Sequence, residues 1–477
     1  MLKQTCEVSR EDMQIQQEAI RAIADENLRF AEQNGCKRGA FVLTLGCQQN
    51  EADSEKLMGM AIAMGYEPVE HAEQASLIMV NTCAIREHAE KRALSLVGQY
   101  KHLKAKNPEL LIVMCGCMVV QEHRVEDIKH RYPYVDVLLG TSSIHRLPGL
   151  ILDKLRRGKR VFCPDETEYR VAEGLPVHRE SSYRAWVSVM YGCNNFCSYC
   201  IVPYVRGRER SRDKDAILNE VRLLVEEGYR DITLLGQNVN SYGKDRGGEY
   251  DFADLLSELD QIEGDYRLQF MTSHPKDATK KLIDVMAASR HIAHRFHLPM
   301  QSGSNRILKE MNRRYDMEKY MGIVSYIREK MPDAVITSDI IVGFPGETEE
   351  DFEDTMNALR QARFDMIFSF IYSPRKGTPA AEMNCQIPKN IQNARFERLL
   401  ALQQGISLAS NEPLVGKTVR VLCDGMSKND SSKYSGRTEG GKIVFFDGDP
   451  SNTGAFLSVT IERAEPFALY GTVSHNG

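Results

Sequence analysis

The sequence lacks three features that would direct it to a membrane, to export or to general binding of polyanions. It has no apolar run long enough to span a bilayer. The first residues lack the apolar core of a secretory signal peptide. The formal net charge is −5, so the whole molecule is not a polycation and any nucleic-acid surface must be a local patch. We therefore expect a cytoplasmic protein without a membrane association.

Cysteine, by contrast, is plentiful: the chain has 12 cysteines among 477 residues. In a reducing compartment such cysteines bind metal or are buried, and they are seldom paired as disulfides. The length predicts about three domains at roughly 150 residues each. An apolar content of 42% with 27% charged residues is ordinary for globular protein, so the chain can build sizeable cores.

The densest cysteines form a CxxxCxxC pattern at Cys193, Cys197 and Cys200. The run from Ala185 to Met190 predicts a buried strand, so the three thiols follow its carboxyl end, where α/β folds place their chemistry. Three thiolates leave a structural zinc site one ligand short, but they suit a cubic iron–sulfur cluster with one open iron. A chance cluster or a zinc knuckle without its fourth ligand is the alternative. With Tyr199 before the last cysteine, the pattern resembles that of the radical S-adenosylmethionine (SAM) superfamily.

Upstream, the sequence predicts one long helix and then a sheet. Ser9 and Asp12 fit a capping box and Gly35 fits a helix stop. We expect one face of this helix to consist of Met13, Ile20, Ile23, Ala24 and Leu28. From residue 40 onward, expected strands alternate with expected helices, which predicts a parallel doubly wound sheet. The strands are 41–45, 77–80, 110–114 and 135–139, and the helices are 52–64 and 84–100.

A second group of three cysteines follows the first three of these strands, namely Cys47, Cys83 and Cys117. The carboxyl ends of parallel strands face one crevice, so these thiols are expected to converge and to hold a second cluster. The alternative is that each is a buried small hydrophobe, which is the usual fate of a lone cysteine. Loop-like neighbours such as Gly46 and Gly116 favour the cluster.

Cys115 competes with Cys117 for the third position. It alternates with Val113 along the expected strand, so we predict that it points into the core. The cysteines predicted not to be ligands are Cys6, Cys36, Cys115, Cys163, Cys385 and Cys423.

Residues 155–182 are polar and interrupted by glycine and proline, which predicts a linker. Beyond it, six expected strands alternate with helices and predict a partial (β/α)6 barrel with its active loops at the strands' carboxyl ends. These strands are 185–190, 231–235, 267–271, 295–298, 334–341 and 365–371. The loops that follow them supply candidate SAM contacts: Gly236, Gln237, Asn238, Ser273, Gln301, Ser302, Val342 and Phe344.

The last segment changes to short, glycine-punctuated strands at 415–422, 434–438, 442–446 and 455–463, which predict a small β-barrel. Its basic residues suit contacts with RNA phosphates, although a solvated charged face is an equal alternative. The candidates are Lys417, Arg420, Lys433 and Arg437, with Arg206 and Arg208 from the loop after the first cysteine group. For the loop arginines, contact with the SAM carboxylate or pairing with Glu209 and Asp213 is the alternative.

The order of these parts resembles the methylthiotransferase family of radical SAM enzymes, over nearly the whole chain after residue 38. The motifs that carry the resemblance are Gly46–Asn50, Asn81–Arg86, Gly116–Met118, Tyr191–Arg212 with its stretch Val202–Glu209, and Leu298–Ser304. Gln49 departs from the pattern, since close relatives commonly have methionine there. Residues 1–37 lie outside the resemblance.

After the helical extension (1–37) predicted above, we expect four segments: an iron–sulfur domain (38–154), a linker (155–182), and, as the resemblance implies, a radical SAM barrel (183–410) and an RNA-binding TRAM barrel (411–477). It implies two [4Fe-4S] clusters, ligated by the two cysteine groups, and SAM. The implied reaction replaces C2–H of N6-dimethylallyladenosine at tRNA position 37 by S–CH3. One SAM would methylate sulfur held on the cluster of Cys47, Cys83 and Cys117, and another would supply the radical. A flavodoxin- or ferredoxin-type electron donor and a sulfur source are implied partners.

Other substrates remain open within the same family, namely threonylcarbamoyladenosine in tRNA or an aspartate of a ribosomal protein. An alternative from another class is an RNA-binding iron–sulfur sensor without catalysis. Formation of 5′-deoxyadenosine from SAM would separate the enzyme from the sensor.

Overall fold

The computed structural model describes residues 7–84, 87–164, 170–428 and 430–474. The chain divides into two compact units. The N-terminal unit comprises Met1–Glu180, Ser188–Asn194 and Ile201–Ala216, and the C-terminal unit comprises Ser181–Val187, Asn195–Cys200 and Ile217–Gly477. Within the described ranges, no helix combines the length and apolar character needed to cross a membrane.

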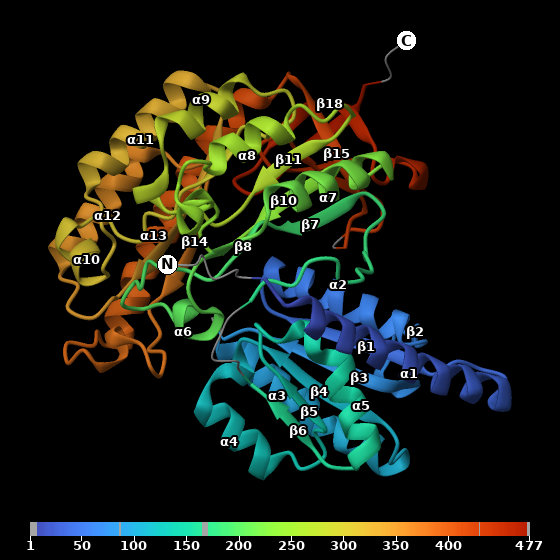
Figure 1. Ribbon diagram of the computed structural model, residues 1–477. Helices are drawn as coiled ribbons and strands as arrows, with labels where there is room; N and C mark the ends of the chain where they lie inside the picture. The colour runs from blue at the N-terminus through green and yellow to red at the C-terminus, as the bar shows by residue number, and fades with distance from the viewer. Residues whose placement is uncertain (1–6, 85–86, 165–169, 429, 475–477) are drawn as a thin grey trace. The chain divides into compact units, whose positions relative to one another are not determined.

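The N-terminal unit is built on a six-stranded sheet in the order β2-β1-β3-β4-β5-β6 (Figure 1). Every neighbouring pair is parallel, which confirms the predicted doubly wound class. The strands are β1 (Gly39–Leu45), β2 (Glu67–Pro68), β3 (Ala75–Thr82), β4 (Leu111–Gly116), β5 (Val137–Leu139) and β6 (Val161–Cys163). The sequence did not predict the two edge strands, because β2 and β6 are too short to show a periodicity. β6 also lies inside the expected linker 155–182, whose first part therefore belongs to the sheet.

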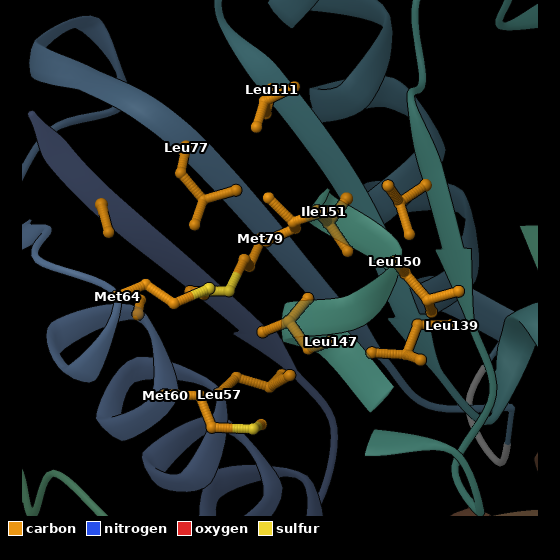
Figure 2. Close-up of a cluster of buried hydrophobic side chains, with 14 of the residues drawn as sticks. Leu57, Met60, Met64, Leu77, Met79, Leu111, Leu139, Leu147, Leu150 and Ile151 are labelled. Carbon is orange, nitrogen blue, oxygen red and sulfur yellow. The ribbon is translucent and has the colours of Figure 1, made fainter. Parts of the chain in front are cut away.

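Alternate residues of the strands enter two separate cores, as expected for a sheet covered on both faces. Along β4, Val113 and Cys115 pack on one face with Leu57 and Leu147, whereas Met114 packs on the other. Figure 2 shows the first of these cores, in which leucine and methionine side chains from the sheet meet those of the covering helices. The longer helices of this unit include α1 (Arg10–Asn34), α2 (Gln48–Ala63), α3 (Glu87–Lys106), α4 (Glu122–Arg131) and α5 (Leu147–Arg157).

Helix α1 has the predicted ends but a different buried face. The Ser9 hydroxyl accepts the Asp12 N–H at 3.1 Å, and the Gly35 N–H closes the last turn on Ala31. The face that packs consists of Gln16, Ala19, Ile23 and Asn27, while Leu28 is 60% exposed. The two polar side chains can be buried there because both are hydrogen-bonded: Gln16 accepts the Gly149 N–H, and Asn27 donates to the Met64 carbonyl. Of the predicted apolar face, Ile20 and Ile23 pack against the core, whereas the prediction was wrong for Leu28 and did not include Gln16, Ala19 and Asn27.

The C-terminal unit begins with two parallel three-stranded sheets, ordered β11-β10-β7 and β12-β13-β14. All six predicted strands are present: β7 (Arg184–Ser188), β10 (Asp231–Leu235), β11 (Arg267–Phe270), β12 (Arg295–His297), β13 (Val335–Val342) and β14 (Met366–Ile371). Between and after them lie α7 (Lys214–Glu226), α8 (Phe252–Leu259), α9 (Lys280–Ala288), α10 (Asn305–Glu310), α11 (Met317–Lys330), α12 (Glu349–Ala362) and α13 (Lys389–Asn411). A short helix, α6 (Val202–Arg206), and the hairpin of β8 (Met190–Tyr191) and β9 (Arg210–Ser211) belong to the N-terminal unit.

The chain ends in a closed barrel ordered β15-β16-β17-β19-β18, as the glycine-punctuated strands predicted. Its strands are β15 (Thr418–Met426), β16 (Tyr434–Thr438), β17 (Ile443–Phe446), β18 (Phe456–Ala464) and β19 (Leu469–Val473). The sequence did not predict β19, which closes the barrel by pairing with both β17 and β18. This barrel is fastened to the rest of its unit, since Arg267 donates to the Thr438 carbonyl at 2.7 Å and Lys442 binds Asp365 at 2.7 Å.

Candidate metal centre and the residues around it

Three thiols meet where β1, β3 and β4 end. The strands are in register there, with Leu45 opposite Thr82 and Thr82 opposite Gly116. Cys47, Cys83 and Cys117 come one or two residues later, so the register delivers all three to one place. Cys83 is hydrogen-bonded to both other thiols, and Cys83 and Cys117 are each only 2% exposed. The structure thus brings together the three cysteines that the sequence predicted to converge.

The glycines before two of these cysteines allow the close approach of the loops. A Cβ atom at Gly46 would lie 2.5 Å from Oδ1 of Asn50 and 2.9 Å from Cβ of Cys83. Gly116 has a φ of 96°, and a Cβ there would lie 2.3 Å from the Thr82 carbonyl oxygen. Any side chain at these positions would push the cysteine loops apart, which explains the Gly-Cys pairs of the sequence.

Amide side chains tie the same loops together. Asn50 Oδ1 accepts from the Cys47 thiol at 3.3 Å, and Asn50 Nδ2 donates to Asn81 Oδ1 at 3.0 Å. Asn81 in turn donates to the Asn50 carbonyl at 2.8 Å and to the Ser54 hydroxyl at 3.0 Å. Both asparagines are almost fully buried, so these bonds shape the centre without solvent competition.

The electrostatics of the centre favour ionised sulfur. The hydrogen bond from Cys83 lowers the pKa of Cys47 to about 6, against the effect of burial and with help from the Arg206 guanidinium. The same donor, again against burial and aided by Arg206, lowers the pKa of Cys117. Because Cys83 donates to two sulfurs, its own pKa is raised. Metal-bound cysteine is a thiolate, so this environment suits a ligand set.

The donor set fits a cluster better than a single ion. In the part of the chain that the structure describes, no three Cys, His, Asp or Glu side chains are arranged tightly enough to hold one metal ion. The ligands of a cubic cluster bind separate irons, so they need not surround a single point. Three thiols at one crevice, two of them with lowered pKa values, therefore match a [4Fe-4S] cluster with an open iron.

The remaining cysteines have other surroundings. Cys115 is fully buried beside Val113, as predicted, and burial raises the pKa of its thiol. Cys163 accepts an N–H of Arg146 at 3.5 Å, and Cys423 lies in the core of the small barrel. Cys36 and Cys385 are exposed. Cys6 lies outside the described residues, as do Ile85 and Arg86 of the second motif.

The CxxxCxxC loop crosses the division between the two units after Asn194, so its two parts are described separately. In the N-terminal unit, the Cys193 N–H donates to the Gly207 carbonyl at 3.0 Å, and the Asn194 N–H donates to Glu209 at 3.2 Å. Gly192 is required here, because a Cβ would lie 2.1 Å from the Arg208 carbonyl oxygen.

In the C-terminal unit, the segment with Cys197 and Cys200 is held by the residues that follow α10. Asn312 Nδ2 donates to the carbonyl of Phe196, whose φ of 47° turns the loop sharply. Arg313 is 4% exposed and places Nη1 3.5 Å from the Cys197 sulfur, while its Nη2 donates to the Pro299 carbonyl. No sequence pattern pointed to Arg313, because it is 116 residues away from Cys197 and no periodicity connects positions so far apart.

The predicted SAM contacts all lie at the carboxyl ends of the central strands, but their surroundings differ. Asn238 donates to Asp277 at 2.8 Å, and its buried Oδ1 has no hydrogen-bond partner within the described chain. Gln301 adopts a φ of 69°, Gly236 accepts from Thr272, and Ser273 donates to the His297 carbonyl. Ser302 is engaged with Thr355, and Phe344 is fully buried against Tyr372. Gln237 and Val342 flank the same strand ends. The orphaned Asn238 oxygen is the group that best fits a bound polar ligand.

The predicted RNA contacts separate into one buried and several exposed residues. Arg206 is 4% exposed and is bonded to Cys117 and Asp53, which gives it a role different from the predicted contact with phosphate. Arg208 and Lys417 are exposed. Arg420, Lys433 and Arg437 form surface ion pairs with Glu439, Asp447 and Asp424. Such pairs contribute little energy, so they can exchange for phosphate.

Three parts of the chain match known families. Residues 39–140 match Uncharacterized protein family UPF0004, residues 187–359 match the Radical SAM superfamily, and residues 413–474 match the TRAM domain. Among solved structures, the radical S-adenosylmethionine methyltransferase TsrM from Kitasatospora setae is similar with a TM-score of 0.54 at 13% identity, over 72% of this chain and 75% of that one. That likeness concerns the fold alone.

Two curated relatives are similar over nearly their whole length. The chain is 46% identical over 466 residues to tRNA-2-methylthio-N(6)-dimethylallyladenosine synthase of Acetivibrio thermocellus, covering 98% of this chain and 97% of that protein. It is 48% identical over 431 residues to the synthase of that name from Clostridium botulinum, covering 90% and 96%. The chain therefore belongs to the tRNA-2-methylthio-N(6)-dimethylallyladenosine synthase family of radical SAM enzymes, a membership that implies a [4Fe-4S] cluster and SAM as cofactors.

Proposed function

We propose that the protein replaces C2–H of N6-dimethylallyladenosine at tRNA position 37 by S–CH3, with two SAM molecules and with sulfur held at a second [4Fe-4S] cluster. The observation that carries this proposal is the meeting of Cys47, Cys83 and Cys117 at the end of the N-terminal sheet. A radical SAM enzyme that only cleaves SAM needs one cluster. A second site with three thiols and an open iron is what a sulfur-inserting enzyme requires in addition.

The two groups of three cysteines would each bind one cluster. Cys193, Cys197 and Cys200 would hold the SAM-binding cluster, and Cys47, Cys83 and Cys117 would hold the second one. When bound, the clusters and SAM supply the one-electron cleavage, the methyl group and the sulfur that acid–base side chains do not provide.

The chain's own residues bind and orient these groups. Asn50 and Asn81 fix the loops of the second centre, and burial of Cys83 and Cys117 limits the access of water to it. In the C-terminal unit, Arg313 places a charge beside the Cys197 sulfur, and Asn238 offers an unpartnered oxygen to a polar ligand such as SAM. Arg208 and the exposed cations of the small barrel would contact tRNA phosphates.

The partners follow from the reaction. The anticodon loop of tRNA presents unstacked bases that a protein can reach. An electron donor of flavodoxin or ferredoxin type and a sulfur source complete the set. A cytoplasmic location is consistent with the substrate.

The test uses the reconstituted full chain with SAM, dithionite, sulfide and tRNA that carries dimethylallyladenosine. Nucleoside mass spectrometry should show the 2-methylthio product, and the supernatant should contain 5′-deoxyadenosine. Conversion of tRNA that carries threonylcarbamoyladenosine instead would change the assigned substrate. Absence of 5′-deoxyadenosine would indicate a sensor rather than an enzyme.

Iron analysis tests the two centres separately. The reconstituted wild-type chain should bind about eight irons, four for each cubic cluster. Replacing either cysteine group with alanine should leave about four. Loss of all iron after replacement of Cys193, Cys197 and Cys200 alone would contradict two independent sites.

A further inference from the structure

The guanidinium of Arg206 is buried and donates a hydrogen bond directly to one of the three thiols. Its Nε donates to the Cys117 sulfur at 3.2 Å, and its Nη2 donates to Asp53 Oδ2 at 2.9 Å. Arg206 is 4% exposed, Asp53 is 1% exposed and Cys117 is 2% exposed. Burial of a guanidinium costs free energy that its hydrogen-bonded pair with Asp53 offsets, and solvent screens the buried charge very little.

Two further residues orient this guanidinium from behind. Gln49 Nε2 donates to the second carboxylate oxygen of Asp53 at 3.1 Å, and it also donates to the Ser188 hydroxyl at 2.9 Å. Because Asp53 is held at one oxygen by Gln49, its other oxygen faces Arg206. The result is a continuous line of hydrogen bonds from Ser188 through Gln49, Asp53 and Arg206 to the Cys117 sulfur. All of its members belong to the N-terminal unit.

We propose that Arg206 is a positioning residue that sets the reduction potential of the cluster on Cys47, Cys83 and Cys117, with Asp53 and Gln49 holding it in place. This inference rests on the proposed function, because it requires a cluster at those cysteines. The relevant step is the gain of one electron by the cluster, supplied by the external reductant, which makes the cluster more negative by one charge.

The sign of the effect follows from Coulomb's law. A positive charge beside a cluster sulfur stabilises the reduced form more than the oxidised form, so Arg206 raises the potential. An N–H donor to a ligand sulfur acts in the same direction, and hydrogen bonds to cluster sulfurs are known determinants of potential. The Asp53 charge lies behind the guanidinium and opposes it. Removal of the Asp53 charge is therefore expected to shift the potential upward, opposite to removal of the Arg206 charge.

If Arg206 had only a structural role, its replacement would have a different effect. If Arg206 only braced the loop, its replacement would lower stability or iron content, and the potential of the remaining cluster would stay where it was. Opposite shifts for Arg206 and Asp53 variants would not arise from bracing, because both substitutions break the same ion pair.

The experiment uses the full chain with Cys193→Ala, Cys197→Ala and Cys200→Ala, so that only the second cluster is present. After anaerobic reconstitution, iron per chain is measured, and the midpoint potential is determined by mediated titration followed by electron paramagnetic resonance. At the parent's midpoint potential, Arg206→Gln should lower the ratio of reduced to oxidised cluster about tenfold, which equals about 59 mV for one electron. Asp53→Asn should raise that ratio.

Arg208→Gln is the matched control, because Arg208 lies on the same loop but is exposed to solvent. In this variant, the ratio of reduced to oxidised cluster at the parent's midpoint potential should change less than twofold. Arg206→Lys keeps the charge without the Nε–H donor, so it should fall between the parent and Arg206→Gln. Should Arg206→Gln fail to bind iron, Arg206→Lys and Asp53→Asn decide the question with shifts of opposite sign.

An unchanged potential in iron-loaded Arg206→Gln, or shifts of the same sign in the arginine and aspartate variants, would overturn the inference. Failure of the parent variant to bind about four irons is a different outcome, since it would remove the second cluster and with it the proposed function.

Discussion

Asn50 and Asn81 lock two cysteine loops to each other through reciprocal hydrogen bonds. Asn50 Nδ2 donates to Asn81 Oδ1 at 3.0 Å, and Asn81 Nδ2 donates to the Asn50 carbonyl oxygen at 2.8 Å. Asn50 lies in the first turn of α2, three residues after Cys47, and Asn81 lies near the end of β3, two residues before Cys83. The spacing of the two thiols therefore depends on a pair of amides rather than on the thiols alone.

Replacement of Asn81 by leucine should loosen the second centre. It leaves the buried Asn50 amide and carbonyl without their partner, at a cost of about 1–3 kcal/mol in the free energy of unfolding. Urea denaturation measures that loss, and iron per chain should fall in the variant that lacks the other three cysteine ligands. Asn34→Ala, at an exposed position of α1, should change stability by no more than about 0.5 kcal/mol. Unaltered stability and iron content in Asn81→Leu would show that the amide pair does not support the centre.

Cys115 and Cys117 are two positions apart, yet their alanine variants should differ in cluster content and in the formation of the methylthio product. Cys115 is fully buried in the apolar core, so Cys115→Ala should keep both clusters and the activity, at a packing cost on the order of 1 kcal/mol. Cys117→Ala should lose the second cluster and the methylthio product while 5′-deoxyadenosine is still formed. Iron analysis and nucleoside mass spectrometry report on both. Loss of the cluster in Cys115→Ala would reverse the assignment within this pair.

The small barrel should contribute tRNA affinity without contributing chemistry. Deletion of the barrel is a poor test, because Lys442 is bonded to Asp365, Ser410 and Asn411 at 2.7 to 2.9 Å. We therefore expect the informative change to be Lys417→Gln with Lys433→Gln. Binding of tRNA should weaken, and each lost phosphate contact should reduce the salt slope by about 0.9 or less.

Cleavage of SAM without tRNA should be unaffected in the same double variant. Lys159→Gln, at an exposed position outside the barrel, is the matched control. If the double variant binds tRNA as tightly as the wild type, with the same salt slope, the barrel is not the anchor and Arg208 becomes the next candidate.

Glu347 should make stability depend on pH. Burial raises the pKa of this carboxyl to about 7, although Gly343 N–H and Arg395 both favour its ionised form. The folded protein thus holds a proton that the unfolded chain releases near pH 4.5. The protonated carboxyl therefore adds to the free energy of unfolding. This contribution is complete below the pKa that Glu347 has in the unfolded chain, and it is lost as the pH rises through the pKa that Glu347 has in the folded protein.

Compared with Glu347→Gln, the wild type should lose on the order of 3 kcal/mol between pH 4.5 and pH 7. Denaturant titrations at several pH values measure the difference. Glu350→Gln, at an exposed position of α12, is the matched control. Parallel curves for the wild type and Glu347→Gln would show that Glu347 is ionised throughout this range.

Much of the architecture could be predicted from the sequence, because it depends on local patterns. Alternating strands and helices indicated the parallel sheet and the six central strands, short glycine-punctuated strands indicated the small barrel, and all three are present. The convergence of Cys47, Cys83 and Cys117 was also predictable, since each follows a parallel strand and such strands end at one edge. The strand pattern also assigned Cys115 to the core, because it shares the face of Val113, whereas Cys117 lies one residue beyond the end of β4.

Only the tertiary structure decided which groups surround the thiols. Arg206 is 89 residues from Cys117 and Arg313 is 116 residues from Cys197, and no periodicity connects positions so far apart. The sequence also did not predict the strands β6 and β19. They are recognised by their pairing with β5, β17 and β18, which a local pattern does not reveal. On α1, hydrogen bonds to buried backbone groups placed Gln16 and Asn27 on the inner face. The sequence by itself thus determined where the sulfur atoms gather, whereas sheet register and loop packing determined the charges that act on them.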